Sequence, residues 1–561
     1  MLVIPYVNLM MNEELLPQYL QKYPVLQGVL GRMDNYRLEI SIWFGGFYMV
    51  KNTLLIIFTY VQRTILKQLQ VNIIDRMFRR YMRQTYLFHV ETRSSDLVRS
   101  IIYDANHFVD GILVQGVLLI SELLLFTGIL MIMVWQSPIA LGVLFIMVVP
   151  VVIVYLLIKR RLSAWGRVLQ EREADVICHI QEGLGGIKDA IILRAQRYFE
   201  NKFYSIVLLR AHVNRNRQVA IAAPRYIIET MMMVSMACAL VWLDYAGGIT
   251  GNLSTIAFLA VVAIRMLPMS NRVLGAISTL KTSGPSAEVI YENARPEVYK
   301  EDLQQSSNLG MGLQHEEFIK LEVVDLSFQY PGGDKVIDGV SFSVKNGEMI
   351  GFVGGSGAGK TTLVDLLLGL LVPTEGEIRV NKENIHKDLD SWQHIIGYVQ
   401  QSVFLLDASI KENIAFGVAQ DEIDSNRVME VIRLAKLEEW INTLPQQLES
   451  LVGERGVRIS GGQKQRIGIA RALYHDPDIL VLDEATSALD NRTEKEIMDD
   501  VYRMHGKRTI IMIAHRLDTI RRCDRILVLE DGKVVGEGLF DELMERNKFF
   551  QKISQVYDRG V

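Results

Sequence analysis

The sequence predicts two fused parts: an α-helical transmembrane domain and an α/β domain with a phosphate-binding loop. Three observations support this fold class. Five apolar stretches in the first 300 residues are long enough to cross a bilayer. A glycine-rich loop at 354–361 stands between an apolar strand and a helix. A later apolar run, Ile479–Leu482, ends in the acidic pair Asp483-Glu484.

The composition limits what kind of protein this can be. The 561 residues are 49% hydrophobic and have a mean hydropathy of +0.17, which indicates a membrane portion. The net charge of −4 combines about +9 over residues 1–300 with about −13 over residues 301–561. The acidic second half argues against nucleic acid as a partner. The three cysteines, Cys178, Cys238 and Cys523, are too far apart to predict a disulfide framework or a zinc site.

The apolar stretches define the predicted membrane spans. They are about Glu39–Gln62, Ile112–Trp135, Ile139–Ile158, Arg225–Leu243 and Leu253–Leu274. Two long polar segments separate the first span from the second and the third from the fourth, and both are rich in Lys and Arg. The positive-inside rule places these segments in the cytoplasm, on the same side as the second half of the chain.

The glycine-rich loop has the residues that hold nucleotide phosphates. It reads Gly354, Gly355, Ser356, Gly357, Ala358, Gly359, Lys360, Thr361, Thr362. Backbone N–H groups of such a loop surround phosphates, Lys360 reaches the β and γ oxygens, and the Thr361 hydroxyl suits Mg²⁺. The run Met349–Val353 is expected to be a buried strand and Thr362–Leu371 a helix.

Further motifs follow in order. Ile459-Ser460-Gly461-Gly462-Gln463 comes about a hundred residues later, Asp483-Glu484 ends a strand, and His515 follows the apolar run Thr509–Ala514. With the phosphate loop, these motifs resemble the nucleotide-binding domain of ATP-binding cassette (ABC) proteins over roughly residues 318–545. Ile459 replaces the usual leucine, which is a swap of equal volume.

The resemblance implies a role for each motif residue and a requirement for ATP and Mg²⁺. Tyr330 would stack on adenine, and Gly354–Thr362 would hold phosphates. Thr361, Gln401 and Asp483 would serve Mg²⁺, Glu484 would be the general base, and His515 would contact the γ-phosphate. The signature residues Ser460, Gly461, Gly462 and Gln463 would bind nucleotide held by another copy, and Ser487–Asp490 would face that copy, with Asp490 in the nucleotide site. One chain has one cassette and no degenerate motif, which favours a homodimer, although a paralogous partner stays open.

ABC exporters of this kind imply a domain plan for the chain. Residues 1–305 would be the transmembrane domain with long cytoplasmic helix extensions, 306–317 a linker, and 318–561 the nucleotide-binding domain. Short transverse helices near Val90–Ser100 and Glu182–Arg194 would dock on the cassettes. Six spans are usual and five are countable, so we expect Met1–Met11 to be the remnant of a first helix lost by truncation or a misassigned start. Glu13–Leu30 could form a short external helix or an interfacial loop helix.

Charges inside the predicted spans point to the cargo. These are Lys51, Glu122, Arg225, Glu229, Arg265 and Arg272. Ionisable groups at this depth usually face a cavity or a partner. Arg225 and Glu229 could instead pair at i, i+4, and Arg272 could snorkel to the interface. The excess of cations suits an anionic headgroup, and arginine suits phosphate.

Two strings narrow the resemblance. Ala222–Glu229 and Arg265–Arg272 look like segments of bacterial flippases of lipid-linked oligosaccharides. That resemblance implies an ATP-driven flippase in the bacterial inner membrane, moving a polyprenyl-pyrophosphate-linked oligosaccharide, with Lys51, Arg225, Arg265 and Arg272 attracting the pyrophosphate. The alternatives are an ABC exporter of another lipid, a peptide or drugs, and an ATP-binding regulator or channel. Intact Glu484 and His515 speak against the last.

Overall fold

The computed structural model describes residues 36–136, 138–247, 253–293, 318–453, 456–484, 491–513 and 517–558. The chain divides into two compact units, 1–84 with 89–302 and 85–88 with 303–561. Met1–Met11, Glu13–Leu30, the linker 306–317, Ser487–Asp490 and His515 lie outside the described residues.

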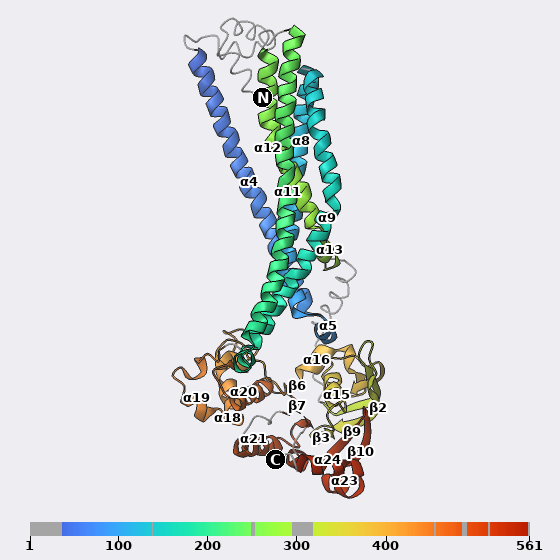
Figure 1. The fold of residues 1–561 in the computed structure, drawn as a ribbon. Helices are drawn as coiled ribbons and strands as arrows, with labels where there is room; N and C mark the ends of the chain where they lie inside the picture. The colour runs from blue at the N-terminus through green and yellow to red at the C-terminus, as the bar shows by residue number, and fades with distance from the viewer. Residues whose placement is uncertain are drawn as a thin grey trace. The chain divides into compact units, whose positions relative to one another are not determined.

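Long helices build the first unit (Figure 1). The helices of residues 36–293 are α4 (Tyr36–Met82), α5 (Tyr86–Glu91), α6 (Ser94–Arg99), α7 (Ala105–Phe108), α8 (Val114–Gln136), α9 (Pro138–Gly185), α10 (Ile187–Ile192), α11 (Gln196–Gly247), α12 (Leu253–Thr282) and α13 (Gly284–Asn293), with π-helical turns η1 (Ser100–Asp104) and η2 (Val109–Leu113). All belong to the first unit except residues 86–88 of α5. Each of the five predicted spans falls on one long helix, except that the second begins in η2. Within the described residues, Ser41–Met82 and Ser94–Met131 also meet a length and composition test for crossing a membrane.

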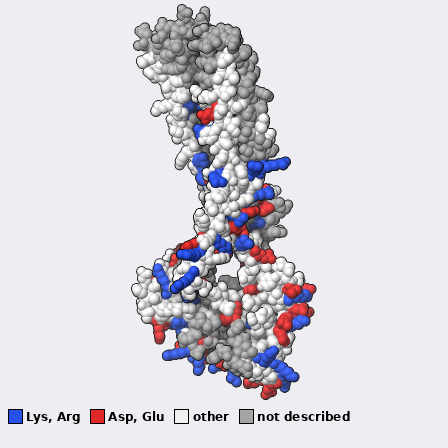
Figure 2. Space-filling model, viewed as in Figure 1, with Lys and Arg blue, Asp and Glu red and all other residues white. Residues whose placement is uncertain are grey.

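The long helices continue well past their apolar stretches. Helix α11 packs along α9, and α12 packs against α8. On the face shown in Figure 2, white surface predominates along the upper part of this unit, and blue side chains become frequent further down the same helices. Lys and Arg therefore gather on the polar extensions, as the sequence predicts.

The predicted transverse helices are present as short helices. Helix α6 lies within Val90–Ser100, and α10 lies within Glu182–Arg194. Thr85–Phe88, a few residues before α6, belongs to the second unit, where Leu87 packs against a hydrophobic core. That α6 and α10 dock on the cassettes stays a prediction. Helix α9 ends at Gly185, and α10 begins after Gly186.

Two sheets form the framework of the second unit. One has the order β2-β1-β4-β5, and the other β10-β9-β3-β8-β7-β6. Their strands are β1 (Lys320–Gln329), β2 (Lys335–Lys345), β3 (Met349–Gly354), β4 (Glu375–Val380), β5 (Glu383–Asn384), β6 (Ile396–Val399), β7 (Ile479–Asp483), β8 (Thr509–Ile513), β9 (Arg525–Glu530) and β10 (Lys533–Gly538). In the six-stranded sheet β9, β3, β8, β7 and β6 are parallel and β10 is antiparallel.

The second unit also contains ten helices and two short 3₁₀ turns among its described residues. They are α15 (Lys360–Leu367), α16 (Leu389–His394), α17 (Ile410–Ile414), α18 (Ser425–Leu434), α19 (Glu438–Asn442), α20 (Gly461–Tyr474), α21 (Asn491–Arg503), α22 (Leu517–Ile520), α23 (Phe540–Arg546) and α24 (Lys548–Asp558), with 3₁₀ turns η4 (Ile385–Lys387) and η5 (Gln447–Glu449). Strands β3, β7 and β8 are buried along their whole length. Continuous apolar runs are typical of parallel strands covered on both faces.

The helix after the phosphate loop differs in its limits from the prediction. We expected Thr362–Leu371, whereas α15 runs from Lys360 to Leu367. Gly369 follows with a φ of 69°, in the left-handed region that ends helices and that glycine adopts at little cost. Because the helix starts at Lys360, its N-terminus meets the phosphate loop directly.

Candidate nucleotide site

The phosphate loop connects β3 to α15 in a tight turn. Gly357 and Gly359 have φ values of 81° and 95°, which only glycine adopts readily. A Cβ on Gly354 would lie 2.4 Å from the Leu529 carbonyl oxygen. Space therefore requires glycine at 354, conformation requires it at 357, and both require it at 359, where a Cβ would lie 2.9 Å from the Val336 carbonyl oxygen.

Lys360 is buried at the base of this loop. Its exposed fraction is 7%, and its ammonium group donates to the carbonyl oxygens of Gly354 at 2.8 Å and Gly355 at 2.9 Å. Burial lowers the pKa of Lys360, and the carboxylates of Glu484 and Asp483 oppose that shift. The loop, the lysine and the helix N-terminus together form a cationic cradle that fits phosphate groups.

Asp483 ends β7 and Glu484 follows it, at the same sheet edge as the loop. Asp483 is 5% exposed and accepts a hydrogen bond from the Tyr398 hydroxyl at 3.4 Å. The next residue, Glu484, has a φ of 49°, which is strained for a side chain of this kind. Gln401 donates from Nε2 to Glu484 Oε2 at 2.5 Å. The structure thus brings Gln401, Asp483 and Glu484 together; their roles toward Mg²⁺ and water stay predictions.

Tyr330 also lies at the loop. Its ring meets Phe328 edge-on at 5.0 Å between centroids, and its hydroxyl lies 3.5 Å from Thr362 Oγ1. An aromatic ring therefore stands beside the second threonine of the phosphate loop. Its stacking on adenine stays a prediction.

The donor set fits Mg²⁺ by its chemistry. Thr361 supplies a hydroxyl, Gln401 an amide oxygen and Asp483 a carboxylate, all of them oxygen ligands. The Tyr398 hydroxyl holds one Asp483 oxygen in place. These residues come from α15, the loop after β6, and β7.

The signature string starts helix α20. Ser460 is its N-cap, accepting from the Gln463 backbone at 3.3 Å, while the Ser460 backbone donates to Gln463 Oε1 at 2.7 Å. This capping box engages the side chains of both residues. Gly461 and Gly462 open the helix, where backbone N–H groups lack helical acceptors and can bind an anion.

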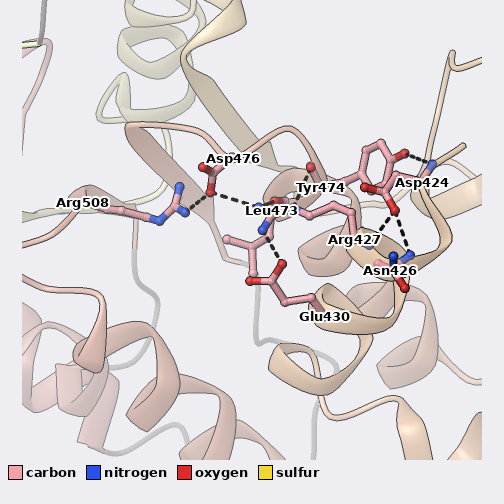
Figure 3. Close-up of polar contacts among 8 residues, drawn as sticks. All are labelled: Asp424, Asn426, Arg427, Glu430, Leu473, Tyr474, Asp476 and Arg508. Carbon is pink, nitrogen blue, oxygen red and sulfur yellow. Dashed lines mark hydrogen bonds and ion pairs between the residues drawn. The ribbon is translucent and has the colours of Figure 1, made fainter. Parts of the chain in front are cut away.

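Contacts at the other end of α20 hold it against its neighbours (Figure 3). Arg427 of α18 donates to the carbonyl oxygens of Tyr474 at 3.0 Å and Leu473 at 2.7 Å, and to Asp476 at 3.0 Å. Arg508, just before β8, also binds Asp476, and it is the main cause of that residue's lowered pKa. The C-terminus of α20 is thus fixed both to α18 and to the six-stranded sheet.

Several residues of the site escaped the sequence analysis. Asp365 on α15 is 9% exposed, and Gln465 on α20 is 3% exposed and donates to the Glu484 carbonyl oxygen at 3.4 Å. Burial, and less strongly the Asp483 carboxylate, raises the pKa of Asp365 to about 6. Burial also raises the pKa of Tyr398. None of these lies in a motif, so only the tertiary contacts single them out.

The predicted cargo residues lie on three helices of the first unit. Lys51 on α4 stands 4.8 Å from the Tyr48 ring centroid. Arg272 on α12 donates to the two carboxylate oxygens of Glu122 on α8, at 2.5 and 3.2 Å. In the part of the chain that the structure describes, no carboxylate forms an ion pair with Lys51, Arg225 or Arg265. The i, i+4 pair Arg225–Glu229 that the sequence left open is absent there.

Comparisons with known proteins place the chain in a family. Residues 337–487 match the family model of the ABC transporter, and residues 24–267 match that of the ABC transporter transmembrane region. The ATP-dependent lipid A-core flippase of Burkholderia orbicola (strain AU 1054) is 31% identical over 89% of this chain and 82% of its own length. The heterocyst differentiation ATP-binding protein HepA of Nostoc sp. is 28% identical over 89% of this chain and 81% of its own length.

A solved structure shares the whole fold. A bacterial Atm1-family ABC exporter with ATP bound matches with a TM-score of 0.78 over 97% of this chain and 95% of that one, at 22% sequence identity. The helical first unit is therefore a transmembrane exporter domain, and the second is an ABC nucleotide-binding domain. The chain belongs to the ABC transporter family, as an exporter-type half-transporter whose ATPase drives transport.

Proposed function

We propose that two copies of this chain form an exporter that flips a lipid with an anionic headgroup, and that the cargo is a polyprenyl-pyrophosphate-linked oligosaccharide. The observation that carries the proposal is a set of cations on membrane helices, Lys51, Arg225 and Arg265, with which no carboxylate of the described residues forms an ion pair. Charge at this depth is costly unless a ligand or cavity uses it. Arginine matches the oxygens of a pyrophosphate especially well.

The pairing of Arg272 with Glu122 refines the predicted cargo site. A guanidinium whose Nε and Nη2 already bind a carboxylate offers less attraction to a headgroup. We therefore assign the stronger attraction to Lys51, Arg225 and Arg265, and keep Arg272 as a weaker contributor.

The nucleotide site supplies the energy through residues of this chain. Lys360 and the loop Gly354–Thr362 would hold the phosphates, and Tyr330 would hold the base. Mg²⁺, bound by Thr361, Gln401 and Asp483, would neutralise charge on the phosphates. Glu484, whose carboxylate contacts Gln401, would accept the proton of the attacking water. Ser460–Gly462 would reach the phosphates held by the second copy, Asp490 would face that copy in the nucleotide site, and His515 would contact the γ-phosphate.

A second candidate cargo is supported by the relatives. The Burkholderia orbicola protein, 31% identical, is a lipid A-core flippase. A lipid A-core glycolipid is thus the alternative cargo for this chain. With either cargo, the proposed location of the protein is the bacterial inner membrane, with its nucleotide-binding domain in the cytoplasm.

Flipping in proteoliposomes tests the proposal. The chain is reconstituted and offered a fluorescent polyprenyl-pyrophosphate oligosaccharide or a fluorescent lipid A-core, with and without ATP. We expect ATP-dependent flipping of the first, and an Arg265→Gln variant that flips at least about tenfold more slowly, since a lost charge-assisted hydrogen bond to a charged group costs about 1.5–3 kcal/mol. Arg197→Gln changes an exposed cation near the start of α11 and should flip normally.

The outcomes separate the parts of the proposal. Flipping of the lipid A-core alone would replace the oligosaccharide by the alternative cargo. Equal flipping by Arg265→Gln and Arg197→Gln would refute the role of the membrane cations. A Glu484→Gln variant should bind ATP but lose hydrolysis by about a hundredfold or more, and near-normal ATPase activity would refute the role of Glu484 as base.

A further inference from the structure

Residues 401–407, named here the Gln401 loop, run between β6 and α17 and are held along one side by helix α20. At one end, Gln401 contacts Glu484 through the 2.5 Å hydrogen bond. Further along the loop, Val403 and Phe404 contact Gly468 and Arg471 of α20, the helix that the signature residues begin. The loop and this helix are thus in physical contact within one chain.

Four consecutive residues of this loop are fixed by different means. A Cβ on Gly468 of α20 would lie 2.6 Å from Val403 Cγ2, so the helix and Val403 touch at a position where only glycine fits. Arg471 of α20 donates from Nη1 to the Phe404 carbonyl oxygen at 2.9 Å. Leu405 is 1% exposed and contacts Gly456, where a Cβ would lie 2.8 Å from Leu405 Cδ1.

The fourth residue, Leu406, is held by Asn413 of α17. The Asn413 side chain is fully buried, accepts from the Leu406 N–H at 2.9 Å and donates to the Leu406 carbonyl at 3.1 Å. Arg471 binds the same asparagine, donating from Nε to the Asn413 carbonyl at 2.9 Å and from Nη2 to Asn413 Oδ1 at 3.3 Å. One guanidinium therefore connects α20, α17 and the Gln401 loop.

Arg471 is well suited to this place. Its guanidinium carbon stands 4.6 Å from the Phe416 ring centroid, which adds a cation–π contact. Burial lowers its pKa to about 10, so it keeps its charge at neutral pH. The planar fork of arginine serves several acceptors at once, which a lysine ammonium cannot reproduce in the same geometry.

We propose that Arg471, with Asn413 and Gly468, is a positioning residue that joins the Gln401 loop and the signature helix into one mechanical unit. A displacement of Gln401 at the phosphates of its own site would then move Ser460–Gly462, which act at the site of the second copy. This inference rests on the proposed roles of Gln401 and the signature residues. It assigns to Arg471 the coupling between the two nucleotide sites of the dimer.

Kinetics and hydrogen exchange of the full chain in lipid nanodiscs test this coupling. We expect Arg471→Ala to lower kcat by about tenfold or more, because small misplacement of catalytic groups is costly. The Kd for ATP should stay within about threefold, because the phosphate loop is untouched. Amide exchange in 401–407 should become faster. Arg427→Ala is the matched control: it removes contacts to the same helix but not to the Gln401 loop, and should leave exchange in 401–407 unchanged.

A rescue experiment separates coupling from general damage. Gly468→Ala pushes a methyl group into Val403 and should lower kcat as Arg471→Ala does, without removing a charge. Adding Val403→Ala makes room for that methyl group and should restore kcat. If Arg471→Ala does not fold, Arg471→Lys gives the same comparison, with a partial loss expected.

Two results would overturn the proposal. In the first, the decrease in kcat of Arg471→Ala and of Arg427→Ala is proportional to the decrease in Tm of each variant, and amide exchange in 401–407 is the same in both. The other is a Gly468→Ala variant that Val403→Ala fails to rescue. Both differ from a failure of the proposed function, which would appear as continued hydrolysis in Glu484→Gln.

Discussion

At the scale of single residues, Asp365 is a buried carboxyl group beside the proposed metal ligand Asp483. Its pKa of about 6 lies above the value of about 3.9 expected in an unfolded chain. The folded state therefore binds this proton more tightly. The stability that it contributes is fully present below about pH 4 and is lost as the pH rises through 6. Tyr398 and Tyr86 also face this carboxyl group.

We expect Asp365→Asn to raise Tm at pH 8 in the absence of nucleotide, because asparagine imitates the neutral acid. The gain in unfolding free energy should be on the order of 1–2 kcal/mol at pH 8 and should shrink toward pH 5. Thermal unfolding at both pH values measures it. Asp338→Asn is the control, since Lys533 lowers the pKa of that exposed carboxyl and its loss should not stabilise the protein. A lower Tm for Asp365→Asn at pH 8 would contradict the assignment.

Gly359 gives a second prediction at this scale. Its φ is 95°, and a Cβ there would lie 2.9 Å from the Val336 carbonyl oxygen. Gly359→Ala should therefore destabilise the domain by about 1–3 kcal/mol and weaken ATP binding. Gly355→Ala, where a Cβ would meet nothing within 4 Å, should have much less effect on stability. Calorimetric unfolding and ATP titration check both variants, and equal losses would show that loop geometry is not what fixes Gly359.

The motif residues of the candidate site could be named from the sequence, whereas its buried surroundings could not. Lys360, Asp483 and Glu484 stand in short strings whose neighbours determine their local structure. Gln465 and Arg471 meet their hydrogen-bond acceptors only when α20 packs against other segments. For Arg471 these acceptors lie more than fifty residues away in the sequence. Sequence periodicity shows that these residues are helical, but it does not show which acceptor a long polar side chain will meet.

At the scale of elements, the contacts of α20 decide how its N-terminus is oriented. Arg427 binds two carbonyl oxygens at the α20 C-terminus and also the Asp476 carboxylate (Figure 3). Arg427→Ala should lower the unfolding free energy by about 1–3 kcal/mol, because buried acceptors lose a charged donor. Arg433→Ala, which breaks only an exposed ion pair with Glu438, should cost less than about 1 kcal/mol. Denaturant unfolding compares the two, and equal losses would be contrary to this view.

Strand positions followed from the sequence more closely than helix limits did. Strands β3, β7 and β8 lie where continuous apolar runs predict them, because burial on both faces leaves a clear pattern. Helix α15 ends earlier than predicted because Gly369 takes a left-handed conformation. The transverse segments were placed approximately, since amphipathic helices of six residues leave little periodic signal.

At the scale of the whole molecule, the Arg272–Glu122 pair joins two helices of the transmembrane domain. Arg272→Gln leaves Glu122, which is 7% exposed, without its partner, and should destabilise the domain by about 3–5 kcal/mol. The double variant Glu122→Gln with Arg272→Gln should recover much of this loss. Unfolding in detergent measures it, with Arg265→Gln as a control that should keep its Tm. An equally unstable double variant would show that the pair is not the cause.

The last prediction concerns the dimer. If Ser460–Gly462 of one copy complete the site of the other, and both sites must hydrolyse ATP for transport, a dimer with one Glu484→Gln copy should not transport. Mixed dimers are made by co-expressing wild type and Glu484→Gln with different tags. The amount of each tagged chain in the purified protein is then quantified. Transport should then follow the square of the wild-type fraction, because random pairing gives active dimers only when both copies are wild type. A linear dependence would mean that each site works alone.

A dimer of one Ser460→Ala copy and one Glu484→Gln copy gives a stricter test. If the signature acts across the interface, both defects fall on the same nucleotide site, and the second site is left intact. If the mixed dimer hydrolyses ATP faster than either variant alone, the signature acts in the partner's site. If it does not, the signature acts in the site of its own chain.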